Sequence, residues 1–448
     1  MSDTDVTAAS ALFTDLYELT MACAYAAEGM DQSAVFELFF RRMPRTRNFI
    51  LAAGLDAVLS YLESWRFTPD DRDYLAGLGL FPDDFLDALG ALRFTGDVYA
   101  VPEGTVVFEN EPLVQVVAPL IEAQIVETYL LNQIHFQSIA AAKAARVVLA
   151  AGQRGVVDFG SRRAHGTDAA LAVARVSYLA GAVGTSNVLA GRRYGIPVFG
   201  TMAHSYIQAH RDERAAFQAF ARVFPETTLL VDTYDSLEGV VEVIRLARQL
   251  GKDFHIRAIR LDSGDLADLA RQSRGLLDAA GLHAVRIFAS SELDEEAIAA
   301  FARQDVPIDT FGVGTRMAVS PDAPALDMAY KLVAYDNRPC VKLSTAKVIY
   351  PGRKQVHRFM KGDVMHHDVV SRFDEPAGGI PLLRQVMAGG VRTAAGRDSL
   401  DTCRARAARE LAGLPERLRA PEKALPHLVT ISDALQHDLE RFKEARKK

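Results

Sequence analysis

Six short apolar runs between residues 155 and 316 limit most strongly what this chain can fold into. Each run ends in a polar cluster, and the interval to the next run is long enough for a helix and two loops. The runs are 155–160, 196–201, 227–232, 256–265, 285–291 and 308–315. Continuous apolar runs are typical of parallel strands that are buried on both faces. Six strand–helix units in series therefore predict an α/β protein, built as a barrel or as an open doubly wound sheet.

The residues that follow these expected strands are polar, charged and rich in glycine. In both architectures ligands bind at the carboxyl ends of the parallel strands. A sheet with a purely structural role does not need polar or charged residues at the end of nearly every strand. The pattern therefore favours a site for an anion, a sugar hydroxyl or a metal ion, and it makes a non-enzymatic scaffold the weakest alternative.

The flanking segments follow other patterns. Helical periodicity dominates residues 11–95, where Thr14 is the expected N-cap, and strand-like alternation follows over 96–119. Beyond the last apolar run, 329–349 predicts two strands and 400–448 predicts surface helices.

Composition narrows the class further. Of the 448 residues, 49% are hydrophobic and 24% are charged, so the chain can bury a core and disorder is not expected. The net charge of −6 is not the basic excess typical of nucleic-acid-binding proteins. The three cysteines lie far apart in sequence, which argues against a disulfide framework or a structural zinc site. No apolar run reaches membrane-spanning length, so we expect a cytoplasmic protein with neither nucleic acid nor membrane as partner.

The motif IRLDSGD at 259–265 places Arg260 beside the acids Asp262 and Asp265, with a Ser263–Gly264 turn between them. Two carboxylates at this spacing can hold Mg²⁺ or ribose hydroxyls, and an arginine can bind a carboxylate in bidentate fashion. The structural alternative is an N-cap at Asp262 with a solvated ion pair.

The motif GVGTR at 312–316 contributes Gly312, Gly314 and Thr315. Glycines let backbone N–H groups point at an anion, which suits a phosphate monoester. An ordinary strand-to-helix turn uses the same residue types and is the alternative.

Three further motifs carry candidate residues. FGSRRAHG holds Arg162 and Arg163, whose like charges favour an anion, with surface salt bridges as the alternative. GTMAHS holds Thr201 and His204, and histidine suits acid–base or nucleophilic work near neutral pH, although a lone histidine is more often structural. TDLYELTM holds Tyr17, which on its own would be taken as a half-buried helix residue.

In this order, the five motifs TDLYELTM, FGSRRAHG, GTMAHS, IRLDSGD and GVGT resemble those of nicotinate phosphoribosyltransferases. The resemblance implies transfer of a phosphoribosyl group from 5-phosphoribosyl-1-diphosphate to nicotinate, giving nicotinate mononucleotide and diphosphate in NAD salvage. It also implies ATP as co-substrate, hydrolysed through a phosphohistidine, with Mg²⁺ present. The implied fold is an irregular α/β barrel plus an α+β domain formed from both chain ends, and the implied assembly is a homodimer.

The resemblance also assigns roles to single residues. His204 matches the phosphorylated histidine, Thr201 matches a nicotinate contact, and Tyr17 matches the aromatic that packs on the pyridine ring. Arg260 is similar to the arginine that binds the nicotinate carboxylate, and Asp262 is the candidate for the ribose hydroxyls or Mg²⁺.

The remaining candidates surround the donor. Thr315, with Gly312 and Gly314, is similar to a 5′-phosphate ligand. Arg162 or Arg163 is assigned to the diphosphate or the carboxylate. The other expected substrate-binding residues belong to the IRLDSGD turn and are Ser263, Gly264 and Asp265. With Arg316 nearby in sequence, we expect a locally basic site.

We expect three segments: 1–119 as the first part of the α+β domain, 120–328 as the barrel, and 329–448 as the return to the α+β domain with added surface helices. Nicotinamide phosphoribosyltransferase is one alternative, but a neutral amide would leave Arg260 unpaired. Quinolinate phosphoribosyltransferase is another, and it needs more basic groups and no GTMAHS. A sugar-phosphate isomerase or aldolase is a third, although no strand between 155 and 316 ends in a Schiff-base lysine.

Overall fold

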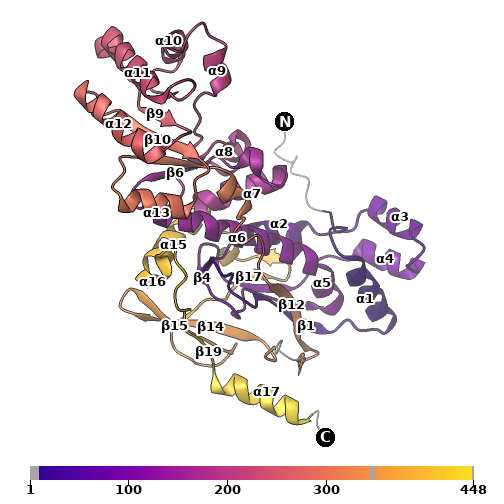
Figure 1. The fold of residues 1–448 in the computed structure, drawn as a ribbon. Helices are drawn as coiled ribbons and strands as arrows, with labels where there is room; N and C mark the ends of the chain where they lie inside the picture. Colours follow the sequence, from indigo (N-terminus) through magenta and orange to yellow (C-terminus); the bar gives the residue numbers. More distant parts are fainter. Residues whose placement is uncertain (1–9, 344–348, 446–448) are drawn as a thin grey trace. The chain divides into compact units, whose positions relative to one another are not determined.

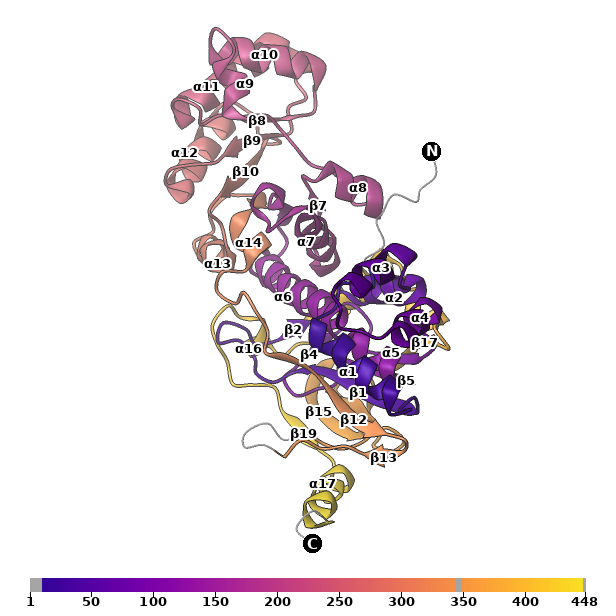
Figure 2. The same cartoon turned by 90° about the vertical axis from the view of Figure 1, so that its right-hand side faces the viewer.

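The computed structural model describes residues 10–343 and 349–445 (Figures 1 and 2). Within these residues the chain divides into two compact units. Unit 1 comprises the residues up to 139, those from 325 to 419 and those from 423 onward, and unit 2 comprises 140–324 with 420–422. Unit 1 is therefore assembled from both chain ends around the insertion of unit 2. The expected limits at 119/120 and 328/329 stay predictions.

Unit 2 is built on a parallel sheet that curls into a half-barrel. Among the described residues its six strands follow the order β7-β6-β11-β10-β9-β8, and all their pairings are parallel. The strands are β6 (Gly155–Asp158), β7 (Gly184–Thr185), β8 (Thr228–Leu230), β9 (Ala258–Leu261), β10 (Arg286–Ser291) and β11 (Thr310–Val313). The predicted α/β class is confirmed.

One expected strand, 196–201, is wrong. This run contributes a single bridge, between Val198 and Thr185, and the two-residue strand β7 takes the sheet position. Pro197 has no N–H to donate, so the run cannot continue a ladder there. It lies so close to β7 that a β-carbon at Gly184 would be 2.3 Å from the Pro197 carbonyl oxygen.

The helices of unit 2 follow the strand ends, and Figure 2 shows α11 and α12 beside β8, β9 and β10. They are α7 (Thr167–Ala180), α8 (Val188–Tyr194), α9 (His204–Gln208), α10 (Glu213–Val223), α11 (Ser236–Leu250), α12 (Leu266–Ala279), α13 (Glu295–Arg303) and α14 (Thr315–Val319), with the short 3₁₀ turns η1 (Ser161–Arg163) and η2 (Gly251–Asp253). An aspartate caps the first turn of four of these helices by accepting backbone N–H bonds; these are Asp212, Asp235, Asp265 and Asp294. Such caps define where each helix begins after its loop.

Unit 1 combines helices with sheets that are antiparallel except at one strand pair, β15 with β19, and this confirms the expected α+β region from both ends. Its largest sheet follows the order β13-β12-β1-β5-β3-β17-β18, so three strands from the first part of the chain form its centre and strands from the last part flank them on both sides. Two smaller sheets, β16-β14-β15-β19 and β2-β4, complete the described strands. The strands are β1 (Ser33–Phe40), β2 (Ile50–Leu51), β3 (Asp97–Ala100), β4 (Val106–Val107), β5 (Val114–Pro119), β12 (Met328–Tyr335), β13 (Arg338–Pro339), β14 (Lys354–Lys361), β15 (Val364–Arg372), β16 (Ile380–Pro381), β17 (Arg384–Ala388), β18 (Val391–Arg392) and β19 (Val429–Ile431).

The helices of unit 1 come from the same two ends. They are α1 (Leu16–Ala27), α2 (Leu55–Ser64), α3 (Pro69–Gly77), α4 (Asp83–Ala91), α5 (Leu120–Ile125), α15 (Leu400–Ala412), α16 (Glu416–Arg419) and α17 (Asp433–Ala445), with the turn η3 (Ala394–Gly396). Helix α6 (Glu127–Ala151) begins in unit 1 and ends in unit 2. The expected hairpin after residue 328 is present as β12 and β13, with Asp336 and Asn337 at positive φ in its turn. Residues 344–348 of that expected pair lie outside the described residues.

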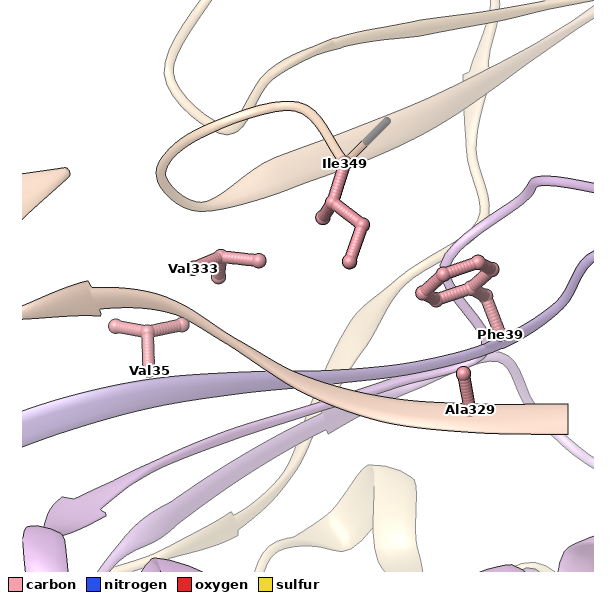
Figure 3. Close-up of a cluster of buried hydrophobic side chains, with 5 residues drawn as sticks. All are labelled: Val35, Phe39, Ala329, Val333 and Ile349. Carbon is pink, nitrogen blue, oxygen red and sulfur yellow. The ribbon is translucent and has the colours of Figure 1, made fainter. Parts of the chain in front are cut away.

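A buried apolar cluster joins the two chain ends across the pairing of β1 with β12 (Figure 3). Phe39 of β1 lies opposite Ala329 of β12 in the antiparallel register. Val35, Val333 and Ile349 complete the cluster, and Val333 is fully buried. Because alternate side chains of paired strands share a face, this register places the apolar set on one side of the sheet.

Candidate active site

Arg260 is the centre of a hydrogen-bonded network at the strand ends of unit 2. It lies on β9 with 13% of its side chain exposed. Its Nε donates to Ser290 Oγ at 2.8 Å, and its Nη1 donates to Thr201 Oγ1 at 3.1 Å and to the Met202 carbonyl at 3.4 Å. Its Nη2 lies 3.1 Å from Asp262 Oδ1. Partners from three separate chain segments at the strand ends therefore hold the guanidinium in place.

Asp232, which follows β8, organises the turn after β9. Its Oδ2 accepts from the Asp262 backbone N–H at 3.0 Å and from Ser263 Oγ at 2.6 Å. Its Oδ1 is buried and has no hydrogen-bond partner among the described residues. Asp232 therefore positions Asp262 while keeping one oxygen available.

His204 is the first residue of α9 and lies beside the same network. Its Nδ1 is 3.1 Å from Thr233 Oγ1, and its Nε2 is 3.9 Å from Asp262 Oδ2. The ring is 41% exposed. With Nδ1 bonded to the threonine hydroxyl, Nε2 is the nitrogen that faces the strand ends.

The turn after Asp262 has a structural explanation of its own. Asp265 is the N-cap of α12 and accepts from the N–H groups of Ala267 and Asp268 at 3.1 Å. The alternative N-cap at Asp262 is therefore wrong, because Asp262 pairs with Arg260 instead. Gly264 adopts φ +81°, a left-handed conformation that favours glycine.

Gly312 packs directly against two stacked aromatic rings, those of Phe159 and Phe288. Phe159 and Phe288 stack with centroids 5.6 Å apart, and the Arg260 guanidinium carbon lies 5.7 Å from the Phe159 centroid. A β-carbon at Gly312 would lie 2.7 Å from the Phe159 ring and 2.8 Å from the Phe288 ring. The absence of a side chain at Gly312 thus lets Phe159 lie flat beside Arg260. Gly314 precedes α14, where Thr315 is exposed.

Arg162 and Arg163 lie on η1, directly after β6. Both are exposed, and neither makes an ion pair with another described residue, so the surface salt bridges considered as their alternative role are absent. Arg316 is likewise exposed in α14. These cations are available to a multiply charged ligand.

Tyr17 belongs to unit 1 and is described within that unit alone. It lies on α1 with 47% of its surface exposed, and burial together with the charges of Glu127 and Glu18 raises the pKa of its hydroxyl. Thr14 is not the N-cap, which is Asp15; the Thr14 hydroxyl instead bonds to the Glu18 carboxylate. The buried face of α1 therefore carries an acid, Glu18, next to Leu19.

Glu18 fixes α1 against α6. It is fully buried, and it accepts from the Thr128 N–H at 3.1 Å and the Thr128 hydroxyl at 2.6 Å. Burial raises the pKa of Glu18 to about 7.

Four residues of the unit 2 network were given no individual role from the sequence: Phe159, Asp232, Thr233 and Ser290. All four are at or just after strand ends, and this position is the signal that could have identified them. Among the described residues, no group of three or more His, Cys, Asp or Glu side chains is arranged to hold a metal ion. No helix in the described part of the chain combines the length and apolar character needed to cross a membrane.

Comparison with known proteins agrees with this arrangement. The family model of the nicotinate phosphoribosyltransferase N-terminal domain matches residues 12–135, and the model of the nicotinate phosphoribosyltransferase family matches 155–370. The nicotinate phosphoribosyltransferase pncB2 of Mycobacterium tuberculosis is 57% identical over 97% of this chain and 94% of its own length. The Bacillus subtilis nicotinate phosphoribosyltransferase is 42% identical over 83% of this chain and 78% of its own.

Two solved structures are similar to this chain over nearly its whole length. The human nicotinic acid phosphoribosyltransferase has a TM-score of 0.84 at 31% identity, covering 96% of this chain and 99% of that one. A nicotinate-nucleotide pyrophosphorylase from Pyrococcus furiosus has a TM-score of 0.74 at 26% identity, covering 92% and 97%. On the matched models and the identity over nearly the whole chain, this protein belongs to the nicotinate phosphoribosyltransferase family.

Proposed function

We propose that this chain transfers the phosphoribosyl group of 5-phosphoribosyl-1-diphosphate to nicotinate, giving nicotinate mononucleotide and diphosphate. The observation that carries the proposal is the Arg260 guanidinium, which is held by Ser290, Thr201 and Asp262 beside the flat face of Phe159. A fixed cation next to an aromatic surface fits a planar ring that bears a carboxylate.

The chemistry requires little from the protein beyond positioning and charge stabilisation. The lone pair of the nicotinate ring nitrogen forms a bond to C1 of the ribose while the bond from C1 to the diphosphate oxygen breaks. The electron pair leaves on the diphosphate, and the transition state resembles an oxocarbenium ion, as in glycoside hydrolysis. Arg260 holds the carboxylate, and the exposed cations Arg162 and Arg163 face the departing diphosphate. The role of Tyr17 as the aromatic that packs on the ring is proposed from the sequence resemblance alone.

The remaining candidates hold the donor. Gly312, Gly314 and Thr315 bind the 5′-phosphate, and Asp262 with Ser263, Gly264 and Asp265 lines the ribose. The carboxylate of Asp265 already caps α12, so its contribution is to hold the turn in shape.

Mg²⁺ is the proposed metal ion, and the residues present fit it. Mg²⁺ usually keeps several waters and binds one or two carboxylates together with substrate phosphates. Asp262 and the partner-free Oδ1 of Asp232 are the carboxylate oxygens that would hold it. When bound, the ion would neutralise charge on the diphosphate.

ATP is the proposed co-substrate, and His204 is its proposed phosphoryl acceptor. Nε2 forms a bond to the γ-phosphorus while the bond to the ADP oxygen breaks, and water later cleaves the phosphorus–nitrogen bond to release phosphate. Phosphorylation would change the charge beside Asp262, and the two states must bind substrates differently for ATP to drive transfer.

Replacing His204 with Ala should abolish ATP hydrolysis and leave slow, uncoupled transfer, because the reacting groups of the transfer step remain. The measurement is phosphate release from ATP alongside formation of nicotinate mononucleotide. His283→Ala removes an exposed histidine from the surface of unit 2 and is the control. Normal ATP hydrolysis by the His204→Ala protein would refute the assignment.

The decisive experiment for the function is turnover of nicotinate with 5-phosphoribosyl-1-diphosphate, with and without ATP, next to nicotinamide and quinolinate. We expect nicotinate to be used and ATP to increase the yield. Preference for nicotinamide would contradict the carboxylate role of Arg260. Turnover of quinolinate would instead favour a quinolinate phosphoribosyltransferase.

The proposed assembly is a homodimer and the proposed setting is the cytoplasm, in NAD salvage. The absence of nucleic acid from its partners stays a prediction. Exposed apolar side chains in unit 2, among them Val188 and Leu189 on α8, support association with a second copy.

A further inference from the structure

Ser290 lies at the end of β10 and belongs to none of the five sequence motifs. It is 3% exposed, and its hydroxyl makes two bonds to charged groups of IRLDSGD. Its oxygen accepts from Arg260 Nε at 2.8 Å, and its hydrogen is donated to Asp262 Oδ1. One hydroxyl therefore joins the cation and the acid of the candidate site.

The position of these bonds on the guanidinium is informative. A guanidinium presents two edges to a carboxylate, a side-on edge formed by Nε and Nη2 and an end-on edge formed by Nη1 and Nη2. Ser290 Oγ occupies Nε, and Asp262 Oδ1 lies 3.1 Å from Nη2. The protein itself therefore fills the side-on edge.

The end-on edge is held less tightly. Nη1 donates to Thr201 Oγ1 at 3.1 Å and to the Met202 carbonyl at 3.4 Å, and the second of these is long for a hydrogen bond. A ligand carboxylate that meets the guanidinium at this edge, beside Thr201, would replace the long bond from Nη1 to the Met202 carbonyl and leave the contacts with Ser290 and Asp262 in place.

We propose that Ser290 is a positioning residue that determines carboxylate recognition. By closing the side-on edge of Arg260 it directs the nicotinate carboxylate to the end-on edge, and by bonding to Asp262 it stops the acid from rotating into that edge. The inference rests on the proposed function, because it concerns the same substrate. It adds a residue, an orientation and a source of selectivity that the motifs do not contain.

A purely structural role is the competing explanation, since buried hydroxyls usually find partners. The two explanations predict different kinetics. If the role is structural, loss of the Ser290 hydroxyl should lower the Tm and raise the KM values for both substrates alike. If Ser290 positions Arg260, the loss should raise the KM for nicotinate selectively.

The experiment compares wild type with Ser290→Ala, Ser290→Thr and the control Ser273→Ala. Ser273, on α12, is also fully buried in unit 2, but its hydroxyl has no hydrogen-bond partner among the described residues. For each protein the kcat and the KM for nicotinate, nicotinamide and 5-phosphoribosyl-1-diphosphate are measured, together with the Tm.

We expect Ser290→Ala to raise the KM for nicotinate by about tenfold or more, as for loss of hydrogen bonds to charged groups. The KM for the donor should rise much less, because the cations facing the diphosphate are unchanged and Asp262, although it loses the bond from Ser290, keeps its contact with Arg260. The preference for nicotinate over nicotinamide should fall. Ser290→Thr, which keeps the hydroxyl, should recover most of the loss, and Ser273→Ala should match wild type.

Equal rises in the KM for nicotinate and the donor would overturn the proposal, as would failure of Ser290→Thr to recover at an unchanged Tm. If Ser290→Ala does not fold, the comparison of Ser290→Thr with Ser290→Cys decides, because only threonine keeps a strong donor and acceptor.

A readout without turnover separates this inference from the proposed function. The ¹⁵N resonance of Arg260 Nε, identified by its loss in Arg260→Lys, should show slow hydrogen exchange in wild type and faster exchange in Ser290→Ala. Equal exchange rates in the two proteins would overturn the positioning role. Failure of wild type to use nicotinate would refute the proposed function and leave the exchange result to decide the role of Ser290.

Discussion

At the scale of single residues, Arg260 illustrates how a charged side chain is prepared for a ligand. Ser290, Thr201 and Asp262 fix its plane before any substrate is present. A preorganised group loses little conformational entropy when it binds, so more of the interaction energy is available for affinity.

Substituting Arg260 by Ala should therefore raise the KM for nicotinate much more than the KM for 5-phosphoribosyl-1-diphosphate. Loss of an ionic hydrogen-bonding partner in a part-buried site is worth about tenfold to a hundredfold in affinity. Steady-state kinetics with each substrate varied in turn measures the two effects. Arg257→Ala, which removes an exposed arginine paired with Glu226, is the control. Equal effects on both KM values would count against carboxylate binding by Arg260.

Sequence reasoning at this scale succeeded within motifs and failed between them. It selected Arg260, Asp262, Thr201 and His204, and the structure brings these four together, although their functional roles stay predictions. It assigned no role to Ser290, because the position of a serine at a strand end does not reveal that its partner is an arginine 30 residues away. The choice between Asp262 and Asp265 as helix cap likewise depends on backbone geometry, which the two identical residue types do not reveal.

At the scale of elements, the docking of α1 depends on an ionisable group. Glu18 is buried against Thr128 of α6, and burial raises its pKa from 4.5 to about 7. The folded state therefore holds the proton more tightly than the unfolded chain. Its stabilising contribution is present at pH values below 4.5 and is lost as the pH rises through about 7.

Glu18→Gln should remove this dependence. Relative to wild type, the free energy of unfolding of the variant should improve by about 2–3 kcal/mol between pH 5 and pH 8, because only wild type must bury a charge at the higher pH. Urea unfolding at the two pH values measures the change. Glu28→Gln, at the exposed end of the same helix, is the control. A difference between Glu18→Gln and wild type that does not vary with pH would contradict the pKa assignment.

The elements themselves were largely predictable because periodicity is a local property. Five of the six apolar runs coincide with strands, and the flanking helices and strands are where the patterns indicate. The exception, 196–201, is apolar because it packs tightly against Gly184 and Thr185, and apolar patterning alone does not distinguish packing against a strand from forming one.

At the scale of the whole molecule, the net charge of −6 conceals a division between paired and exposed cations. Arg260 is paired with an acid, so the expected locally basic character comes instead from Arg162, Arg163 and Arg316, which are exposed. A whole-chain sum could not reveal this, because it weights every charge equally whatever its neighbours.

The proposed homodimer makes a prediction at the same scale. Sedimentation equilibrium at micromolar concentration should give twice the mass of the chain, because exposed apolar side chains on α8 gain from burial. Val188→Asp combined with Leu189→Asp should shift the population toward monomer, since it would bury charges in the interface. Leu425→Asp, an exposed leucine in unit 1, is the control. A monomeric wild type would contradict the proposal.

Gly312 has a consequence that reaches beyond its motif. Any side chain there would push the Phe159 and Phe288 rings outward, since a β-carbon already lies 2.7 Å from the first of them. The Phe159 ring, whose centroid lies 5.7 Å from the Arg260 guanidinium carbon, would have to leave its present position. A residue predicted to bind the phosphate is thus also the one that leaves room for these two rings. A search for variants with altered substrate preference should therefore keep Gly312 and vary Phe159 and Phe288.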